Sequence, residues 1–197
     1  MTYALQIKVL GISGSLRRAS YNTAALREAI RLAPPGMTIE LADISAIPLY
    51  NEELSAQGFP AAVEQLREQV RAADALLIAT PEYNYSVPGV LKNAIDWVSR
   101  PPEQPFAGKP VALMGASAGR FGTARAQYHL RQSMVFLDMR PLNRPELMIA
   151  AAQTLFDEQG ALTDDKTREY LRKLLVALQD WTLSHSAEQS KRMEIKR

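Results

Sequence analysis

A dense group of polar side chains stands between the first apolar run of this chain and its first helical pattern. Residues 11–23 (GISGSLRRASYNT) contain five aliphatic hydroxyl or amide side chains and two arginines, and those that could hold a phosphate are Ser15, Arg17, Ser20, Asn22 and Thr23. Hydroxyls and amides donate hydrogen bonds to phosphate oxygens, an arginine adds a fixed charge, and the first N–H groups of a helix attract anions. Because a helix needs only one such residue as its N-cap, their number predicts a phosphate site.

The glycine spacing excludes two familiar phosphate-binding loops. A dinucleotide fingerprint requires glycines in the pattern G-x-G-x-x-G, and the corresponding positions here hold Gly11, Ser13 and Leu16. A P-loop requires Gly-Lys before serine or threonine, whereas Gly108-Lys109 is followed by proline. The sequence therefore predicts a loop that holds the terminal phosphate of a mononucleotide, such as FMN, through side-chain hydroxyls.

A second polar segment, residues 81–88 (PEYNYSVP), follows an apolar run that ends at Thr80. Its prolines stiffen the backbone, its tyrosines supply flat faces with a polar tip, and Asn84 both donates and accepts hydrogen bonds. These properties suit a flat heteroaromatic ring with an imide edge. A rigid turn with packed tyrosines explains the composition equally well, and Glu82 as a general base is a weaker alternative.

A third segment, residues 115–119 (GASAG), matches the nucleophile elbow G-x-S-x-G of α/β-hydrolases, with Ser117 as the nucleophile. Asp138 or Asp157, followed by His185, would complete the Ser–Asp–His chain order. Against this, His185 is expected at the fraying end of the last helix, and a hydrolase leaves the other two segments without a role. A serine esterase is therefore kept as an alternative function.

The composition is that of one ordinary globular domain. The 197 residues are 47% hydrophobic and 22% charged, which suffices for a proper core. The absence of cysteine excludes disulfides, thiol catalysis and thiolate metal sites, and the two isolated histidines form no metal-binding pattern. No apolar run is long enough for a membrane span and the first residues lack a signal-peptide layout, so we expect a cytoplasmic protein.

Excess positive charge is confined to one end of the chain. Residues 186–197 hold four basic and two acidic residues, and the preceding body holds 19 of each sign. A neutral body with a short basic tail argues against a nucleic-acid-binding surface. We expect one domain over residues 1–185 and a frayed polar tail over 186–197.

Apolar runs and helical patterns alternate along the chain and supply the elements that position the three segments. The strand candidates are Ile7–Ile12, Met37–Ala42, Ala75–Ala79, Val111–Gly115 and, more weakly, Met139–Leu142. The helix candidates are Asn22–Leu32, Ala61–Ala73, Val90–Arg100, Thr123–Asp138 and Asp164–Trp181. The alternation predicts an α/β fold with a five-stranded parallel sheet and helices on both faces. Ligands bind such sheets at the carboxyl ends of the strands, which selects loops 13–20, 80–87 and 116–122.

With all three loops in place, the chain resembles the NADPH-dependent FMN reductase family of flavodoxin-like proteins, and within it the bacterial chromate and quinone reductases. The matching segments, between about Ile7 and Glu146, are Gly14–Asn22, Pro81–Gly89, Leu91–Trp97 and Gln127–Gln132. The resemblance implies a flavodoxin-like doubly wound sheet, bound FMN, and NADPH or NADH as electron donor. It implies no catalytic side chain, because the flavin carries the chemistry.

The resemblance also implies roles for particular residues. Those at the FMN phosphate are Ser15, Arg17, Ser20 and Asn22, with Leu16 and Thr23 at the same loop; those lining the isoalloxazine ring are Pro81, Glu82, Tyr83 and Asn84, with Ser117 on its far side. Relatives often carry two glycines after S-x-G, so Thr123 is a departure that could narrow the approach to the ring.

The implied reaction is a ping-pong cycle in which a nicotinamide donor reduces the flavin and an acceptor then replaces the donor. Quinones, azo compounds, chromate and free flavin all suit an exposed flavin. Arg18, Arg120 and Arg125 are each candidates for a second phosphate of the donor. An electron-transfer flavodoxin is the other alternative, but such carriers are typically acidic, unlike the neutral body of this chain.

The resemblance further implies a homodimer or homotetramer with the flavin near the subunit boundary. Residues 124–138 carry more apolar surface than a helix on one face of a sheet needs. We expect Val135–Leu137 to belong to the core, which leaves Tyr128 and Arg125 as interface candidates and Glu146 as their ionic partner across it.

Overall fold

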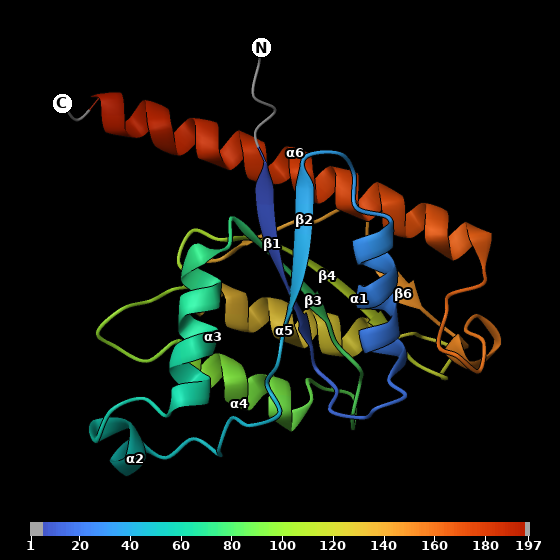
Figure 1. The fold of residues 1–197 in the computed structure, drawn as a ribbon, viewed down its shortest axis with the longest axis horizontal. Helices are drawn as coiled ribbons and strands as arrows, with labels where there is room; N and C mark the ends of the chain where they lie inside the picture. Colours follow the sequence, from blue (N-terminus) through green and yellow to red (C-terminus); the bar gives the residue numbers. More distant parts are fainter. Residues whose placement is uncertain (1–5, 196–197) are drawn as a thin grey trace.

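The computed structural model describes residues 6–195 and contains a parallel sheet between two layers of helices (Figure 1). The strands are β1 (Ile7–Ser13), β2 (Met37–Ala42), β3 (Ala75–Ala79), β4 (Pro110–Ala116), β5 (Arg140–Pro141) and β6 (Leu147–Ile149). The helices are α1 (Tyr21–Arg31), α2 (Glu52–Ala56), α3 (Ala61–Ala72), α4 (Gly89–Val98), α5 (Ala124–Phe136) and α6 (Asp165–Ile195), with a 3-10 turn at Ala152–Thr154.

The strand order confirms the predicted doubly wound topology. The strands lie in the order β2-β1-β3-β4-β5, and every pairing is parallel. β5 pairs with the first residues of β4, and β6 pairs with its last residues. This is the flavodoxin-like order, whose switch point lies between β1 and β3. In the register at that point, Ser13 of β1 is opposite Ala79 of β3, so the loops that follow both strands leave the sheet side by side.

Alternation of side chains along the strands divides the core between the two faces of the sheet. Val9, Leu77 and Met114 point to one face, where they pack with α1 and α6. On the other face, Leu10, Leu76 and Leu113 pack with α3, α4 and α5. The strands β1, β3 and β4 are apolar at nearly every position because helices cover both faces of the sheet.

Four parts of the chain differ from the sequence expectation, and the first two are the fifth strand and α2. The fifth strand, expected over Met139–Leu142, is split: β5 pairs with the start of β4 and β6 with its end, so the sheet has six strands rather than five. Proline within β5 has no N–H to offer a ladder, which accounts for its shortness. The short helix α2 was not predicted.

The last helix is longer than its apolar pattern predicts. It continues past Trp181 to Ile195, so most of the segment expected as a frayed tail is helical, and its red end extends beyond the sheet in Figure 1. Residues 196–197 of the expected tail lie outside the described residues. The fully buried leucines of α6 end at Leu178, and Trp181 and Leu183 still pack, partly buried, against the same core. The sequence pattern therefore marked the end of the fully buried leucines and not the end of the helix.

The end of α5 corrects the expectation that Val135–Leu137 is core. Leu137 is buried, but Val135 and Phe136 each keep 82% of their surface exposed. Three consecutive residues of a helix cannot all face the same side, and here Leu130 and Met134 already fill the sheet-facing side of α5. An exposed apolar surface therefore lies on the outer side of this helix.

Candidate functional site

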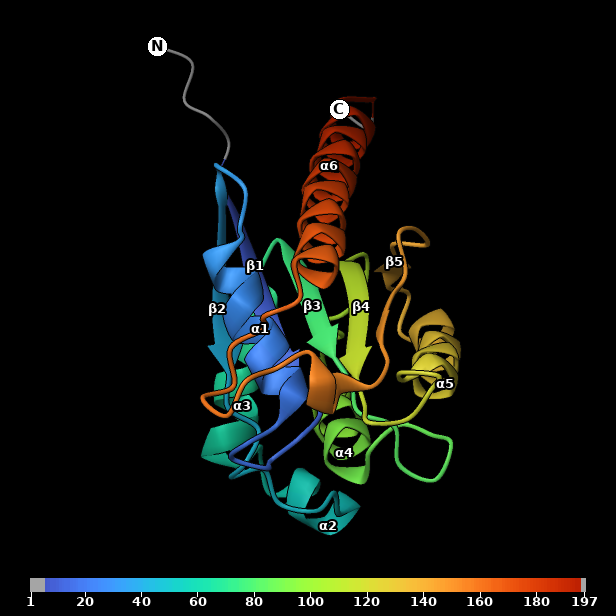
Figure 2. The same cartoon turned by 90° about the vertical axis from the view of Figure 1, so that its right-hand side faces the viewer.

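The three selected loops meet at the carboxyl edge of the sheet, the end to which the arrowheads of β3 and β4 point in Figure 2. The Gly14 N–H donates to the Ala79 carbonyl oxygen at 2.8 Å, which ties the first loop to the end of β3. A side chain added at Gly14 would lie 3.1 Å from Leu91 and Pro81, so this close approach favours glycine. The predicted convergence of the loops is present in the structure.

The first loop is held by its own hydroxyls. The hydroxyl groups of Ser13 and Thr23 form a hydrogen bond of 2.8 Å. Ser20 is the N-cap of α1, and its hydroxyl accepts from the Thr23 N–H at 3.3 Å. The Ser15 hydroxyl accepts from the Arg17 N–H at 3.3 Å. One wall of the resulting hollow, of about 360 Å³, contains Ser15, Leu16, Arg17, Arg18, Thr23 and Arg27.

Positive charge predominates in this hollow: it is lined by three arginines and one acidic residue, Asp43, whose carboxylate accepts from the Ser45 N–H at 2.8 Å. Among the described residues, Arg17, Arg18 and Arg27 have no carboxylate within ion-pair distance, whereas Arg31, one turn further along α1, is paired with Glu28 at 3.0 Å. The backbone N–H groups of Tyr21 and Asn22 at the start of α1 also have no hydrogen-bond partner in the described part of the chain. Free helix N–H groups beside unpaired guanidinium groups form an anion-binding surface.

Asn22 points away from this hollow. Its amide nitrogen donates to the Ala116 carbonyl oxygen, and its amide oxygen accepts from the Ala116 N–H, both at 2.9 Å. The side chain is 3% exposed. It therefore joins the start of α1 to the end of β4, and its free backbone N–H is what it offers to an anion.

The second loop folds back on itself as a tight hairpin. Tyr83 and Ser86 exchange backbone hydrogen bonds at 3.1 and 2.9 Å, and the two residues between them, Asn84 and Tyr85, have φ angles of 51° and 63°. Left-handed backbone is common for asparagine but costly for tyrosine, and such strain concentrates at functional sites. The turn presents Tyr83 and Tyr85 to solvent, both more than half exposed.

Glu82 fastens this hairpin to α5. Its carboxylate accepts from the Arg125 and Ala126 N–H groups at 3.0 and 3.2 Å and pairs with the Arg125 guanidinium at 2.6 Å. The side chain of Glu82 is only 9% exposed. With its oxygens committed to the start of a helix, Glu82 has no role as a general base in this structure.

The third loop packs closely on the strand before it. A side chain at Gly115 would lie 1.9 Å from the Thr123 hydroxyl oxygen and 2.3 Å from the Thr80 carbonyl oxygen. Thr123 is fully buried, and its hydroxyl accepts from Gln127 at 3.0 Å. Thr123 therefore lies beneath the third loop, and its effect on the approach to the ring stays a prediction from the sequence.

Ser117 is engaged within its own loop. Its hydroxyl donates to the Gly122 carbonyl oxygen and accepts from the Gly119 N–H at 3.3 Å. Gly122 has a φ angle of 57°, and a side chain there would meet Met148 at 2.9 Å, so only glycine fits this turn.

The geometry removes the serine esterase alternative. His185 lines a hollow with Asp74 and Lys109, at the ends where β3 and β4 begin, and its ring contacts Trp181. Ser117 follows the other end of β4, whose seven residues span roughly 20 Å. Asp138 is also at the starting end, where it pairs with Arg140 at 2.6 Å, and Asp157 accepts from Ala161 within its own turn. Within residues 6–195, Ser117, His185 and these aspartates therefore do not form a Ser–His–Asp arrangement.

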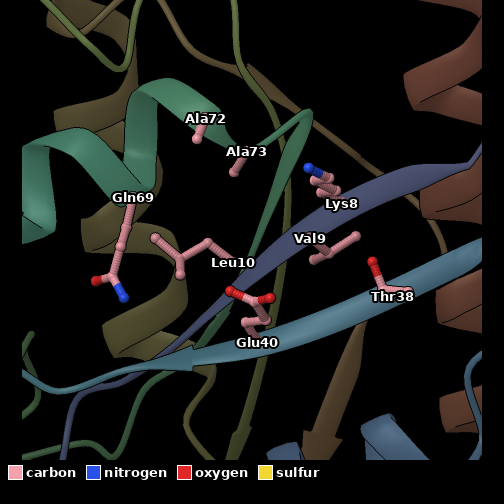
Figure 3. Close-up of a pocket in the computed structure, with 8 residues that line it drawn as sticks. All are labelled: Lys8, Val9, Leu10, Thr38, Glu40, Gln69, Ala72 and Ala73. Atoms are coloured by element: carbon pink, nitrogen blue, oxygen red, sulfur yellow. The ribbon is translucent and has the colours of Figure 1, made fainter.

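A separate small hollow between the end of α3 and strands β1 and β2 offers no chemistry of this kind (Figure 3). Half of its eight lining residues are apolar, and the other four, Lys8, Thr38, Glu40 and Gln69, have polar or charged side chains. Within residues 6–195 no three histidine or acidic side chains come close enough to hold a metal ion, and no helix is long and apolar enough to cross a membrane.

Comparison of the sequence with known protein families identifies the family to which the chain belongs. The sequence model of the family described as NADPH-dependent FMN reductase matches residues 7–154. The chain belongs to this family. As a family member it is an oxidoreductase that uses FMN and NAD(P)H, which confirms the fold, enzyme class and cofactors predicted from the sequence.

Individual relatives of the flavin reductase family extend over nearly the whole chain. An NAD(P)H-dependent FMN reductase of Pseudomonas aeruginosa is 74% identical over 175 residues, which cover 89% of this chain and 95% of that protein. A quinone reductase of Escherichia coli K12 is 49% identical over 87% of this chain and 93% of its own. The solved structure of FerB, a flavoenzyme NAD(P)H:acceptor oxidoreductase of Paracoccus denitrificans, superposes with a TM-score of 0.83 at 35% identity and covers 91% of this chain and 98% of that one.

Proposed function

We propose that this flavin reductase transfers electrons from NAD(P)H to quinones through FMN held at the carboxyl edge of the sheet. The observation that carries the proposal is the group of arginines without ion-pair partners at the first loop, which supports an anion site at the edge where flavodoxin-like sheets bind ligands. The quinone reductase relative supports the acceptor class. Chromate, azo compounds and free flavin stay predictions from the sequence.

The phosphate of FMN fits the donors of the first loop. Arg17 supplies charge, Ser15 and Thr23 supply hydroxyls, and the free N–H of Asn22 supplies a helix-end donor. Ser20 sets the start of the helix, and Leu16 contributes an exposed apolar side chain beside it.

The second and third loops then border the ring. Pro81, Tyr83 and Asn84 would line it from the strained hairpin, with Glu82 acting as the anchor that holds this hairpin on α5. Ser117 would meet the far side through a loop whose shape its own hydroxyl maintains. FMN supplies the redox chemistry when bound, accepting a hydride and delivering two electrons.

The proposed order of events is ping-pong. The rim of the site is built from exposed side chains of all three loops, and one open face would admit the donor and the acceptor in turn. No side chain acts as a nucleophile. The residues instead orient both reactants and keep the ring face accessible.

Steady-state kinetics test this proposal. NAD(P)H oxidation is measured with a neutral quinone as acceptor, at several fixed quinone concentrations, with FMN-saturated protein. We expect parallel double-reciprocal lines, as a ping-pong order requires. Intersecting lines would contradict the order of events, and a lack of quinone-dependent oxidation would contradict the proposed acceptor.

We also propose that the chain forms a homo-oligomer through the outer side of α5. Val135 and Phe136 expose apolar surface there, and Tyr128 is half exposed on the same helix. The sequence had placed Glu146 across an interface, but within one chain it already accepts from the Tyr128 hydroxyl at 3.0 Å. This hydrogen bond raises the pKa of Tyr128. The cytoplasmic location stays a prediction from the sequence.

A further inference from the structure

Two arginines beside the first loop, Arg18 and Arg27, are not used by the FMN site proposed above. Both side chains are exposed, and among the described residues neither has a carboxylate within ion-pair distance. Arg31, one turn further along α1, shows the contrast, since it is paired with Glu28 at 3.0 Å. Like charges that lie close together repel each other, and an anion bound between them relieves this repulsion. The two arginines therefore indicate a second anion site next to that of the FMN phosphate.

Arg18 and Arg27 line a hollow that is separate from the one beside β2. Its volume is about 390 Å³, and its other wall is the turn formed by residues 157–160, between the 3-10 turn and α6. The hollow beside β2 is instead closed by residues 41–45. Arg17, Arg18 and Arg27 line both hollows and so lie between them. An anion in the second hollow thus shares the arginine wall with the FMN phosphate and leaves the first hollow to it.

The turn at residues 157–160 is held against the start of α1. Gly160 has a φ angle of 79°, and a side chain added there would lie 4.0 Å from the Cβ of Ala24. The rings of Tyr21 and Phe156 are in contact, with their centres 5.3 Å apart. In Figures 1 and 2 the orange segment before α6 passes beside α1. Both walls of the hollow are therefore held in position before a ligand arrives.

The two walls carry opposite charges that do not pair with each other. The turn supplies Asp157, whose carboxylate accepts from the Ala161 N–H at 2.8 Å, and Glu158, which forms no ion pair in the described part of the chain. Guanidinium groups bind phosphate oxygens, whereas a free carboxylate accepts hydrogen bonds from sugar hydroxyls. A ligand with a phosphate next to a free hydroxyl satisfies both walls, and a phosphorylated ribose has this composition.

The electron donor of the proposed reaction carries such a group at the required end. Its nicotinamide must lie on the flavin ring, and its adenosine is at the opposite end of the molecule. FMN likewise has its ring at one end and its phosphate at the other. A donor that runs alongside FMN therefore brings its adenosine to the arginines at the phosphate loop. NADPH carries a phosphate on the 2′ oxygen of this ribose, where NADH has a hydroxyl.

We propose that Arg18 and Arg27 bind the 2′-phosphate of NADPH, with Glu158 accepting from the adjacent ribose hydroxyl, and that the enzyme therefore prefers NADPH to NADH. This proposal rests on the proposed function, because it requires FMN at the first loop and the nicotinamide on its ring. Arg125, another candidate from the sequence for this phosphate, is paired with Glu82 at 2.6 Å. Arg120 of the third loop is the remaining candidate, and its substitution is part of the test.

The test compares NADPH and NADH as donors to 1,4-naphthoquinone, with FMN-saturated protein. In the wild type we expect a higher kcat/KM for NADPH. In Arg18→Gln and in Arg27→Gln we expect kcat/KM for NADPH to fall about tenfold, as loss of one exposed charge-assisted hydrogen bond predicts, and kcat/KM for NADH to fall by about twofold or less. Arg31→Gln, on the same helix but paired with Glu28, is the matched control and should change neither value. A loss for NADPH in Arg120→Gln, with none in Arg18→Gln and Arg27→Gln, would place the phosphate at the third loop and overturn the proposal.

A binding measurement separates the phosphate site from turnover. Adenosine 2′,5′-bisphosphate and adenosine 5′-monophosphate differ only in the 2′-phosphate and donate no electrons, and each is titrated calorimetrically into FMN-saturated wild type, Arg27→Gln and Arg31→Gln. We expect the wild type and Arg31→Gln to bind the bisphosphate more tightly than the monophosphate, and Arg27→Gln to bind the bisphosphate about tenfold more weakly than the wild type does. Equal affinities of the wild type for the two nucleotides, equal kcat/KM for its two donors, or equal losses for both donors in Arg27→Gln would overturn the phosphate site. A wild type that distinguishes the nucleotides but oxidises neither donor in the presence of quinone would overturn the proposed function instead.

Discussion

Arg17 is the residue whose charge should distinguish FMN from riboflavin. It lines the hollow at the start of α1 without an acidic partner among the described residues, so its guanidinium is available to a phosphate. We predict that Arg17→Gln weakens FMN binding about ten- to a hundredfold, since a charge-assisted hydrogen bond contributes roughly 1.5–3 kcal/mol. Fluorescence titration of the protein freed of flavin measures this affinity.

Riboflavin supplies the control for Arg17, because it has the ring but no phosphate. Its affinity should be the same in Arg17→Gln and in the wild type. Arg31→Gln, on the same helix but paired with Glu28, should leave the affinity for FMN unchanged. Equal losses of FMN and riboflavin affinity would mean that Arg17 supports the loop rather than the phosphate.

Substitution of Ser117 distinguishes a residue beside the flavin from a hydrolase nucleophile. Its hydroxyl is occupied within the loop at Gly119 and Gly122, and His185 lies at the opposite edge of the sheet. We predict that Ser117→Ala keeps most of its NAD(P)H-dependent quinone reduction, measured at saturating FMN. Near-complete loss of turnover with flavin still bound would contradict this role.

Residue types near a site could be predicted from the sequence more readily than the directions of their side chains. The polar loop at 13–23 was found because hydroxyls, an amide and arginines accumulate between a strand and a helix. The amide of Asn22 nevertheless faces Ala116, and the carboxylate of Glu82 faces the start of α5. These partners are 94 and 43 residues away along the chain, and no local pattern encodes such contacts.

At the scale of elements, the start of α6 shows a cap that depends on pH. The Asp164 carboxylate accepts from the Thr167 hydroxyl at 2.6 Å and from its N–H at 2.7 Å. These hydrogen bonds lower the pKa of Asp164 below its usual value. Because the pKa is lower in the folded state, the carboxylate stabilises the fold above about pH 4 and loses this effect as the pH falls through the folded-state pKa.

We therefore predict that Asp164→Ala lowers the melting temperature at pH 7 and that its difference from wild type shrinks as the solution is acidified. Thermal unfolding followed by circular dichroism between pH 7 and pH 3 measures this difference. Asp165→Ala changes the neighbouring carboxylate in the first turn and should have a smaller effect. A difference that stays constant down to pH 3 would show that the charge of Asp164 is not what stabilises the helix.

Elements were predictable where burial imposes a period on the sequence. The four long strands and the five main helices lie close to their expected positions, because both sheet faces are covered and each helix has an apolar side. The short elements α2 and β6 have few residues with which to show a period. Past Trp181, α6 has only the buried Thr182 and the partly buried Leu183 facing the core, which is too short a pattern to predict a helix that continues to Ile195.

At the scale of the whole molecule, the outer side of α5 predicts association. Phe136 and Val135 expose large apolar surface close together, which is favoured at subunit interfaces. We predict that the protein sediments as an oligomer at micromolar concentration and that Phe136→Glu shifts it toward the 21.9 kDa monomer. Tyr170→Glu, an equally large change at an exposed aromatic residue of α6, is the matched control. A wild type that sediments as a monomer would contradict the proposed assembly.

We propose that one FMN site accepts electrons from NAD(P)H and returns them to a quinone. The most direct measurement follows the absorbance of protein-bound FMN without oxygen, first on adding one equivalent of NADPH or NADH and then on adding one equivalent of 1,4-naphthoquinone. We predict that the flavin absorbance is lost in the first step and restored in the second. A protein that binds no FMN, or a reduced flavin whose absorbance the quinone does not restore, would contradict the account.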